Sequence, residues 1–155
     1  MTSRRVFVDT GAWFAAQVVD DEHHEEAADA LRGLLALPIV LVTTNHVVGE
    51  TYALLRVTRG SDACRRFLDS LDATTRLERL FVSQDLERQA YAILDRYRDH
   101  DFSFVDATTF ALMRAERMRH AFAFDSHFPT AGFVRVPTDV AVGQLGLSRH
   151  APGRK

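Results

Sequence analysis

Two acidic residues follow short apolar runs, at positions where carboxylates could act together. Asp9 comes directly after Val6–Val8, and Asp125 comes directly after Ala121–Phe124. In open parallel α/β sheets the ligand crevice lies outside the carboxyl ends of the strands, so we expect both side chains near such a crevice. An Asp in this position can also cap the following helix, and position alone leaves the two interpretations equal.

A third acid, Glu50, lies in a predicted helix. Val47, Leu54 and Val57 form an apolar stripe on that helix, and Glu50 falls on the same stripe. A carboxylate that faces a core needs a partner or a metal, because burying it bare is costly. The alternative is a Glu at the edge of the stripe that reaches solvent or pairs with an Arg.

The fourth acid, Asp106, lies three residues after Ser103 in a Ser-x-x-Asp pattern that is typical of a helix capping box. Alone, this pattern favours a cap. Together, however, four carboxylates at one sheet edge raise one another's pKa unless a cation neutralises them. Oxygen ligands without Cys or His favour Mg²⁺ or Mn²⁺ over zinc, and Mg²⁺ also takes ligands from a substrate phosphate. The set therefore indicates phosphodiester chemistry.

Short apolar runs alternate with helical patterns along most of the chain, which predicts an α/β fold with a parallel sheet covered on both faces. The predicted strands are Arg5–Val8, Ile39–Val42, Leu77–Val82, Ala121–Phe124 and Phe133–Val136. The predicted helices span residues 10–17, 21–37, 45–58, 61–71, 86–97 and 103–118.

The chain has 155 residues, which is the size of one domain, and we expect that domain to span 1–146 with a disordered tail at 147–155. A net charge of −2 excludes a general polyanion binder. The only cysteine, Cys64, excludes an internal disulfide and lacks partners for a zinc site. No apolar run approaches the length of a membrane span, so we expect a soluble, cytoplasmic protein.

Four segments resemble the acidic motifs of PIN-domain proteins, and more narrowly those of the VapC-type toxins of bacterial toxin–antitoxin operons. The resemblance covers about residues 4–140 and rests on VFVDTGAWFA (6–15), TTNHVVGETYALL (43–55), DFSFVDATTFALM (101–113) and AFAFDSHF (121–128). It implies a three-layer α/β/α sandwich with a central, mostly parallel sheet of about four or five short strands. It also implies Mg²⁺- or Mn²⁺-dependent ribonuclease activity, homodimers, and inhibition by a small antitoxin protein.

By motif position, the resemblance implies a catalytic site made of four residues: Asp9, Glu50, Asp106 and Asp125. Asp9, Asp106 and Asp125 would hold one or two metal ions, and Glu50 would orient or deprotonate the attacking water. Three neighbours would support the ligands or contact substrate, with the first of them beside the metal: Thr10, Ser103 and His127.

A basic cluster follows the helix that contains Glu50, and its members are Arg56, Arg59, Arg65 and Arg66. These side chains could grip RNA phosphates beside the site. A solvated helical surface explains them equally well.

Three other functions fit parts of the sequence. Asp9-Thr10-Gly11 is the triplet of aspartic proteases, but those enzymes have an all-β fold, whereas helical patterns dominate here. A phosphatase or dehalogenase with a strand-end Asp nucleophile would carry a second Asp where Gly11 stands and a Lys in its site, and the only lysine is Lys155. A degenerate PIN domain that binds RNA or a partner without cutting would have lost one or more acids, and all four are present.

Overall fold

A five-stranded parallel sheet organises the chain. The computed structural model describes residues 4–147, and in it the strands lie in the order β3-β2-β1-β4-β5 with every neighbouring pair parallel. The strands are β1 (Arg4–Val8), β2 (Ile39–Thr44), β3 (Leu77–Leu80), β4 (His120–Phe122) and β5 (Val134–Val136). The order reverses direction between β1 and β4, so the carboxyl ends of these two strands open the crevice where α/β sheets bind ligands.

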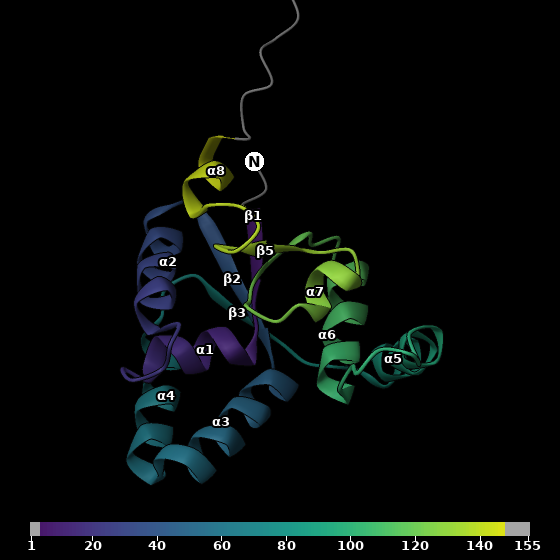
Figure 1. The fold of residues 1–155 in the computed structure, drawn as a ribbon, viewed down its shortest axis with the longest axis horizontal. Coiled ribbons are helices and arrows are strands. Elements are labelled where there is room, and N and C mark those ends of the chain that lie inside the picture. Colours follow the sequence, from purple (N-terminus) through teal and green to yellow (C-terminus); the bar gives the residue numbers. More distant parts are fainter. Residues whose placement is uncertain (1–3, 148–155) are drawn as a thin grey trace, which may run out of the picture.

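Helices cover both faces of this sheet. Figure 1 shows α1, α2 and α4 on one side and α5, α6 and α7 on the other, which is the predicted three-layer sandwich. None of the described helices is both long and apolar enough to cross a membrane. The helices are α1 (Thr10–Gln17), α2 (His24–Ala36), α3 (Asn45–Arg59), α4 (Ser61–Ala73), α5 (Gln84–Arg96), α6 (Phe104–Ala115), α7 (His127–Thr130) and α8 (Val142–Leu147).

The predicted strands and helices are all observed, although several of their ends shift by up to three residues, and three points stand out. The short helices α7 and α8 were not predicted. The predicted strand at Ala121–Phe124 is observed as His120–Phe122, so Asp125 follows a short loop rather than the strand itself. Of the predicted disordered tail, Leu147 ends α8, and residues 148–155 lie outside the described residues.

The central strand and the first helix form the middle of the core. Val6, Phe7 and Val8 have no exposed surface, because helices pack on both faces of β1. Trp13 is 2% exposed; its ring meets Phe67 edge-on with centroids 6.0 Å apart, and its Nε1 donates to Thr43 Oγ1 at 3.3 Å. Trp13 thus joins α1 to β2 and α4, and α1 fixes the chain that leaves β1 at Asp9.

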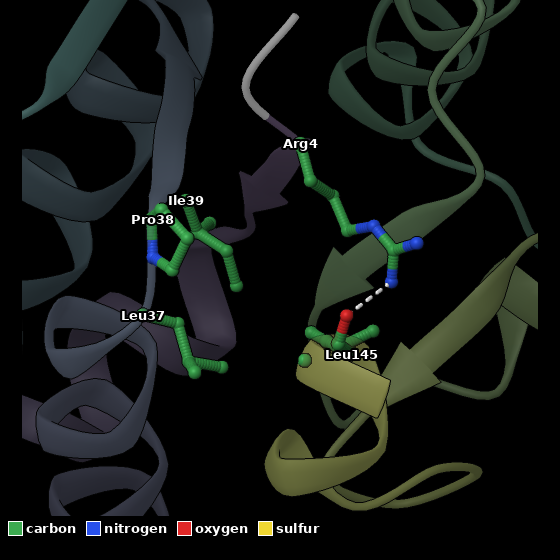
Figure 2. A pocket seen from close by; sticks show the side chains of 6 residues that line it. Arg4, Leu37, Pro38, Ile39 and Leu145 are labelled. Atoms are coloured by element: carbon green, nitrogen blue, oxygen red, sulfur yellow. Dashed lines mark hydrogen bonds between the residues drawn. The ribbon is translucent and has the colours of Figure 1, made fainter. Parts of the chain in front are cut away.

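The opposite end of the sheet, where the strands begin, is closed by α8. Arg4 Nη1 donates to the carbonyl of Leu145 at 2.7 Å, as Figure 2 shows. A pocket of about 200 Å³ lies here, lined by Arg4, Leu37, Pro38, Ile39, Leu145 and Gly146. The start of β1 contributes to this pocket, so it is separated from the acidic crevice by the length of that strand.

Candidate active site

Asp9 occupies the carboxyl end of β1 and the N-cap position of α1. Its backbone N–H donates to Phe122 O at 3.1 Å, which ties it to β4, and its carbonyl accepts from Ala12 and Trp13 at 3.1 and 3.0 Å. Its carboxylate makes no capping hydrogen bond with the helix. The structure therefore separates the two interpretations of this residue: the backbone starts the helix, while the side chain takes no part in the cap.

The carboxyl group of Asp9 lies within electrostatic range of the other three acids. Asp9 is 7% exposed, and its pKa is raised from 3.8 to about 7, chiefly by burial. The charges of Asp106, Glu50 and Asp125 contribute to this rise, and a backbone hydrogen bond from Thr10 opposes it. The structure thus brings together all four of the predicted acids around the end of β1.

The carboxylate of Asp106 is oriented by the capping box that the sequence indicates. Ser103 Oγ accepts from the Asp106 backbone N–H at 3.0 Å, and Asp106 Oδ2 accepts from the Ser103 N–H at 2.9 Å. Oδ2 also lies 3.1 Å from His127 Nδ1. Capping and membership of the acidic cluster are therefore compatible, because the cap fixes the direction in which this carboxylate faces the site.

Asp125 and His127 form a compact group with Asp106. Asp125 Oδ1 accepts from the His127 N–H at 2.8 Å and lies 3.4 Å from its Nδ1. Asp106, Asp125 and His127 each offer one potential ligand atom, and these atoms all lie within 4.8 Å of one another. The ring of His127 rests 5.1 Å from that of Phe102, which restricts its orientation.

Glu50 is half-buried in the second turn of α3, but the predicted core stripe on this helix is wrong. Leu54 is 40% exposed and Val57 is 86% exposed. The buried residues of α3 are Val47, Thr51 and Leu55, which recur at a spacing of four rather than along the predicted stripe. Glu50 therefore lies beside the core-facing side of α3, and its charge contributes to the raised pKa of Asp9.

Thr10 adds an unusual buried hydroxyl. It is 7% exposed, and its Oγ1 has no hydrogen-bond partner among the described residues. A buried hydroxyl without a partner is unfavourable, so its place beside Asp9 suits a bound cation or the water that accompanies one. Together with Asp106, Asp125 and His127, this hydroxyl gives a donor set that fits a divalent cation.

The basic cluster does not join the acids. Its four arginines are exposed on the C-terminal half of α3 and on α4. Arg56 lies ~9 Å farther along α3 than Glu50, at the usual rise of ~1.5 Å per residue. Arg59 Nη2 is 3.4 Å from Asp20 Oδ1, and its guanidinium lies 5.7 Å from the Phe14 ring. A role for Arg56, Arg59, Arg65 and Arg66 in holding RNA stays a prediction.

Sequence reasoning did not single out His46, which links helices around the site. Its Nδ1 lies 3.2 Å from Thr108 Oγ1 on α6, and its Nε2 lies 3.8 Å from Glu87 Oε1 on α5. His46 is one helical turn before Glu50, and that spacing is the signal that could have identified it. The contact fixes α3, which carries Glu50, against α6, which carries Asp106.

Comparison with protein families gives the context for this geometry. The model of the PIN domain matches residues 6–134, which include all four acids. The chain belongs to the PIN-domain family. Within this family it is similar to the 23S rRNA-specific endonuclease VapC20 of Mycobacterium tuberculosis, in both of the strains CDC 1551 and H37Rv. The identity is 41% over 132 residues, which is 84% of this chain and 97% of the relative.

Solved structures agree with the PIN fold. The crystal structure of M. tuberculosis VapC20, described as a toxin that cleaves the sarcin-ricin loop, has a TM-score of 0.76 and 38% identity. The match covers 83% of this chain and 96% of that one. The crystal structure of VapBC2 from Rickettsia felis, bound to a DNA fragment of its promoter, has a TM-score of 0.63 at 13% identity. This match covers 84% of this chain and 96% of that one. The second match bears on the fold alone.

Proposed function

We propose that this PIN domain is a Mg²⁺- or Mn²⁺-dependent endoribonuclease that hydrolyses phosphodiester bonds with an activated water, and that it acts as the toxin of a toxin–antitoxin pair. The observation that carries the proposal is the convergence of Glu50, Asp106 and Asp125 on the buried Asp9. The 41% identity to a 23S rRNA-specific endonuclease supports ribosomal RNA as the substrate class.

The three aspartates are the proposed cation ligands. Asp9 is buried, Asp106 is oriented by its cap, and Asp125 is oriented by the N–H of His127. A divalent cation bound here lowers the pKa of a bound water and stabilises charge on the scissile phosphate. Glu50 is more exposed than Asp9 and is suited to orient the attacking water or accept its proton.

Neighbouring residues have supporting roles in this proposal. Ser103 fixes the carboxylate of Asp106, and Thr10 offers its hydroxyl beside Asp9. His127 lies between Asp106 and Asp125, where it orients them or contacts the phosphate. The exposed arginines of α3 and α4 are proposed to hold RNA phosphates at a distance from the scissile bond.

The partners follow from the family. We propose that the protein forms a homodimer, is inhibited by a small antitoxin encoded with it, and works in the cytoplasm, where ribosomes are found. The described surface offers apolar area for protein contacts: Leu54, Val57, Tyr91 and Phe104 are each at least 40% exposed.

The test is cleavage of intact ribosomes and of total RNA by the purified protein, with Mg²⁺ or Mn²⁺ and with EDTA. Asp9→Asn is the site variant, and Asp95→Asn, which changes an exposed acid on α5, is the matched control. Discrete fragments that require the cation, persist with Asp95→Asn and vanish with Asp9→Asn support the proposal. A folded protein that neither binds cation nor cuts ribosomal RNA would refute it and indicate a degenerate domain.

A further inference from the structure

The loop that carries Asp125 is held from an unexpected side, by the edge strand β5 and the turn that follows it. Arg135 of β5 donates from Nη1 to the carbonyl of Phe124 at 2.9 Å, one residue before Asp125. We propose that Arg135 and Asp139 are positioning residues, which hold the backbone before Asp125 and thereby set the affinity of the site for its cation. The inference rests on the proposed cation site, and it concerns residues that lie just outside the matched PIN segment of 6–134.

The geometry of the pair is that of a clamp. Arg135 Nε and Nη2 donate to Asp139 Oδ2 and Oδ1, each at 3.0 Å, and the Arg135 backbone N–H donates to Oδ2 at 2.8 Å. The turn between them is closed by the N–H groups of Asp139 and Val140, which donate to the Arg135 carbonyl at 2.9 and 3.1 Å. With two donors of the guanidinium fixed in this way, the direction of Nη1 toward Phe124 is also fixed.

The chemistry of this contact requires arginine. The planar guanidinium satisfies a bidentate carboxylate and a separate carbonyl at the same time, whereas a lysine ammonium is a single point of charge. The side chains of Arg135 and Asp139 are 17% and 31% exposed, so the pair is partly shielded from water. The hydrogen bonds from Arg135 also lower the pKa of Asp139, which keeps this carboxylate charged.

Phe124 is immobilised by its ring as well as by its carbonyl. The ring stacks on that of His23 with centroids 4.4 Å apart and an interplanar angle of 9°. The ring of Phe122 lies 6.1 Å away in an edge-on arrangement. These ring contacts hold the side chain of Phe124, whereas the Arg135–Asp139 clamp holds its backbone carbonyl. That carbonyl belongs to the peptide bond that joins Phe124 to Asp125.

Partners behind a metal ligand commonly change metal affinity by 10- to 100-fold when they are removed, because they orient the ligand. If the Arg135–Asp139 pair only stabilised the edge of the sheet, its removal would lower the melting temperature without changing metal affinity. Cation affinity measured without RNA therefore separates a positioning role from a structural one.

The experiment measures Mn²⁺ affinity by calorimetry for the wild type, Arg135→Lys and Asp139→Asn. Arg79→Lys is the matched control, because Arg79 lies on the opposite edge strand β3 and pairs with one aspartate, Asp72, at 3.5 Å. We expect a loss of about 10-fold or more in Mn²⁺ affinity for Arg135→Lys, and a smaller loss in the same direction for Asp139→Asn. Arg79→Lys should stay within about twofold of the wild type.

A double-variant cycle provides the second readout. In an Asp125→Asn background, adding Arg135→Lys should weaken Mn²⁺ binding by no more than about twofold, because the ligand that the clamp positions is already impaired. Unchanged Mn²⁺ affinity in folded Arg135→Lys, or an equal loss in both backgrounds, would overturn the inference. If Arg135→Lys does not fold, Asp139→Asn decides by the same criteria.

The outcomes also separate this inference from the proposed function. If the wild type binds Mn²⁺ and cuts RNA, and Arg135→Lys binds Mn²⁺ with the same affinity, only the role of the clamp is refuted. If the wild type cuts no RNA but binds Mn²⁺ more tightly than Arg135→Lys does, the role of the clamp is supported and the ribonuclease function is refuted. A wild type that binds no Mn²⁺ refutes both.

Discussion

Replacing Asp9 with Asn should stabilise the cation-free protein at neutral pH while abolishing its activity. The folded state raises the pKa of Asp9 from 3.8 to about 7, so between these values the folded chain keeps a proton that the unfolded chain has released. Since the folded state then binds more protons, the free energy of unfolding falls as pH rises through this interval. Above about pH 7 the loss is complete, and below about pH 4 it is absent.

The magnitude follows from the same interval. At about 1.4 kcal/mol per pKa unit, the change from 3.8 to about 7 corresponds to an upper bound of ~4 kcal/mol. We expect ~1–3 kcal/mol in practice, because water and the neighbouring carboxylates rearrange around the ionised group. Asn keeps the shape of Asp and carries no charge, so the variant should recover most of this amount at pH 8.

The assay is urea denaturation in EDTA between pH 4 and pH 8, repeated with saturating Mn²⁺. The wild type should lose stability over this range relative to Asp9→Asn, and Mn²⁺ should reverse the order by stabilising the wild type selectively. At a cation concentration 100 times its dissociation constant, that stabilisation is ~2.7 kcal/mol. An Asp9→Asn protein that is less stable than the wild type at pH 8 in EDTA would refute the electrostatic account of this site.

Three further substitutions test neighbouring parts of the molecule. Glu50→Gln should lower the rate of RNA cleavage by ~100-fold or more while Mn²⁺ still raises the melting temperature, and a rate near that of the wild type would exclude its proton-handling role. Ser103→Ala removes the cap that orients Asp106, so it should lower the free energy of unfolding by ~1 kcal/mol and also lower the affinity for Mn²⁺. Unchanged Mn²⁺ affinity would show that Ser103 only caps the helix. Gly60→Ala should cost ~1–3 kcal/mol in urea denaturation, because Gly60 has φ +87° and ψ −176° between α3 and α4; an unaffected midpoint would contradict this.

The sheet was predictable because its strands are buried on both faces and are therefore short apolar runs. Thr10–Gln17 was predicted with the bounds that the structure shows, since Asp9 and the residues that follow it leave little choice for the start of the helix. The short helices α7 and α8 were missed, because four and six residues are too few to show a helical period.

The four acids were predicted as one set at one edge of the sheet, from two strand ends, one predicted helix stripe and the order of the motifs. Each acid alone had a local explanation, and Asp106 does cap its helix as that explanation requires. The core stripe predicted through Glu50 is wrong because α3 carries apolar side chains on an exposed face as well as on a buried one, as Val57 shows. Periodicity cannot distinguish an apolar face that packs on the core from one that is exposed.

The Arg135–Asp139 clamp had no recognisable sequence signal. A spacing of four between opposite charges normally indicates a pair on one helix face, but Pro137 lies between these two residues and excludes a regular helix. The pair forms instead across a turn, and its third partner is a backbone carbonyl, which any residue provides. The identity of Phe124 therefore carries no information about the contact. Residues that hold a ligand through the backbone leave little trace in sequence, and a structure is required to find them.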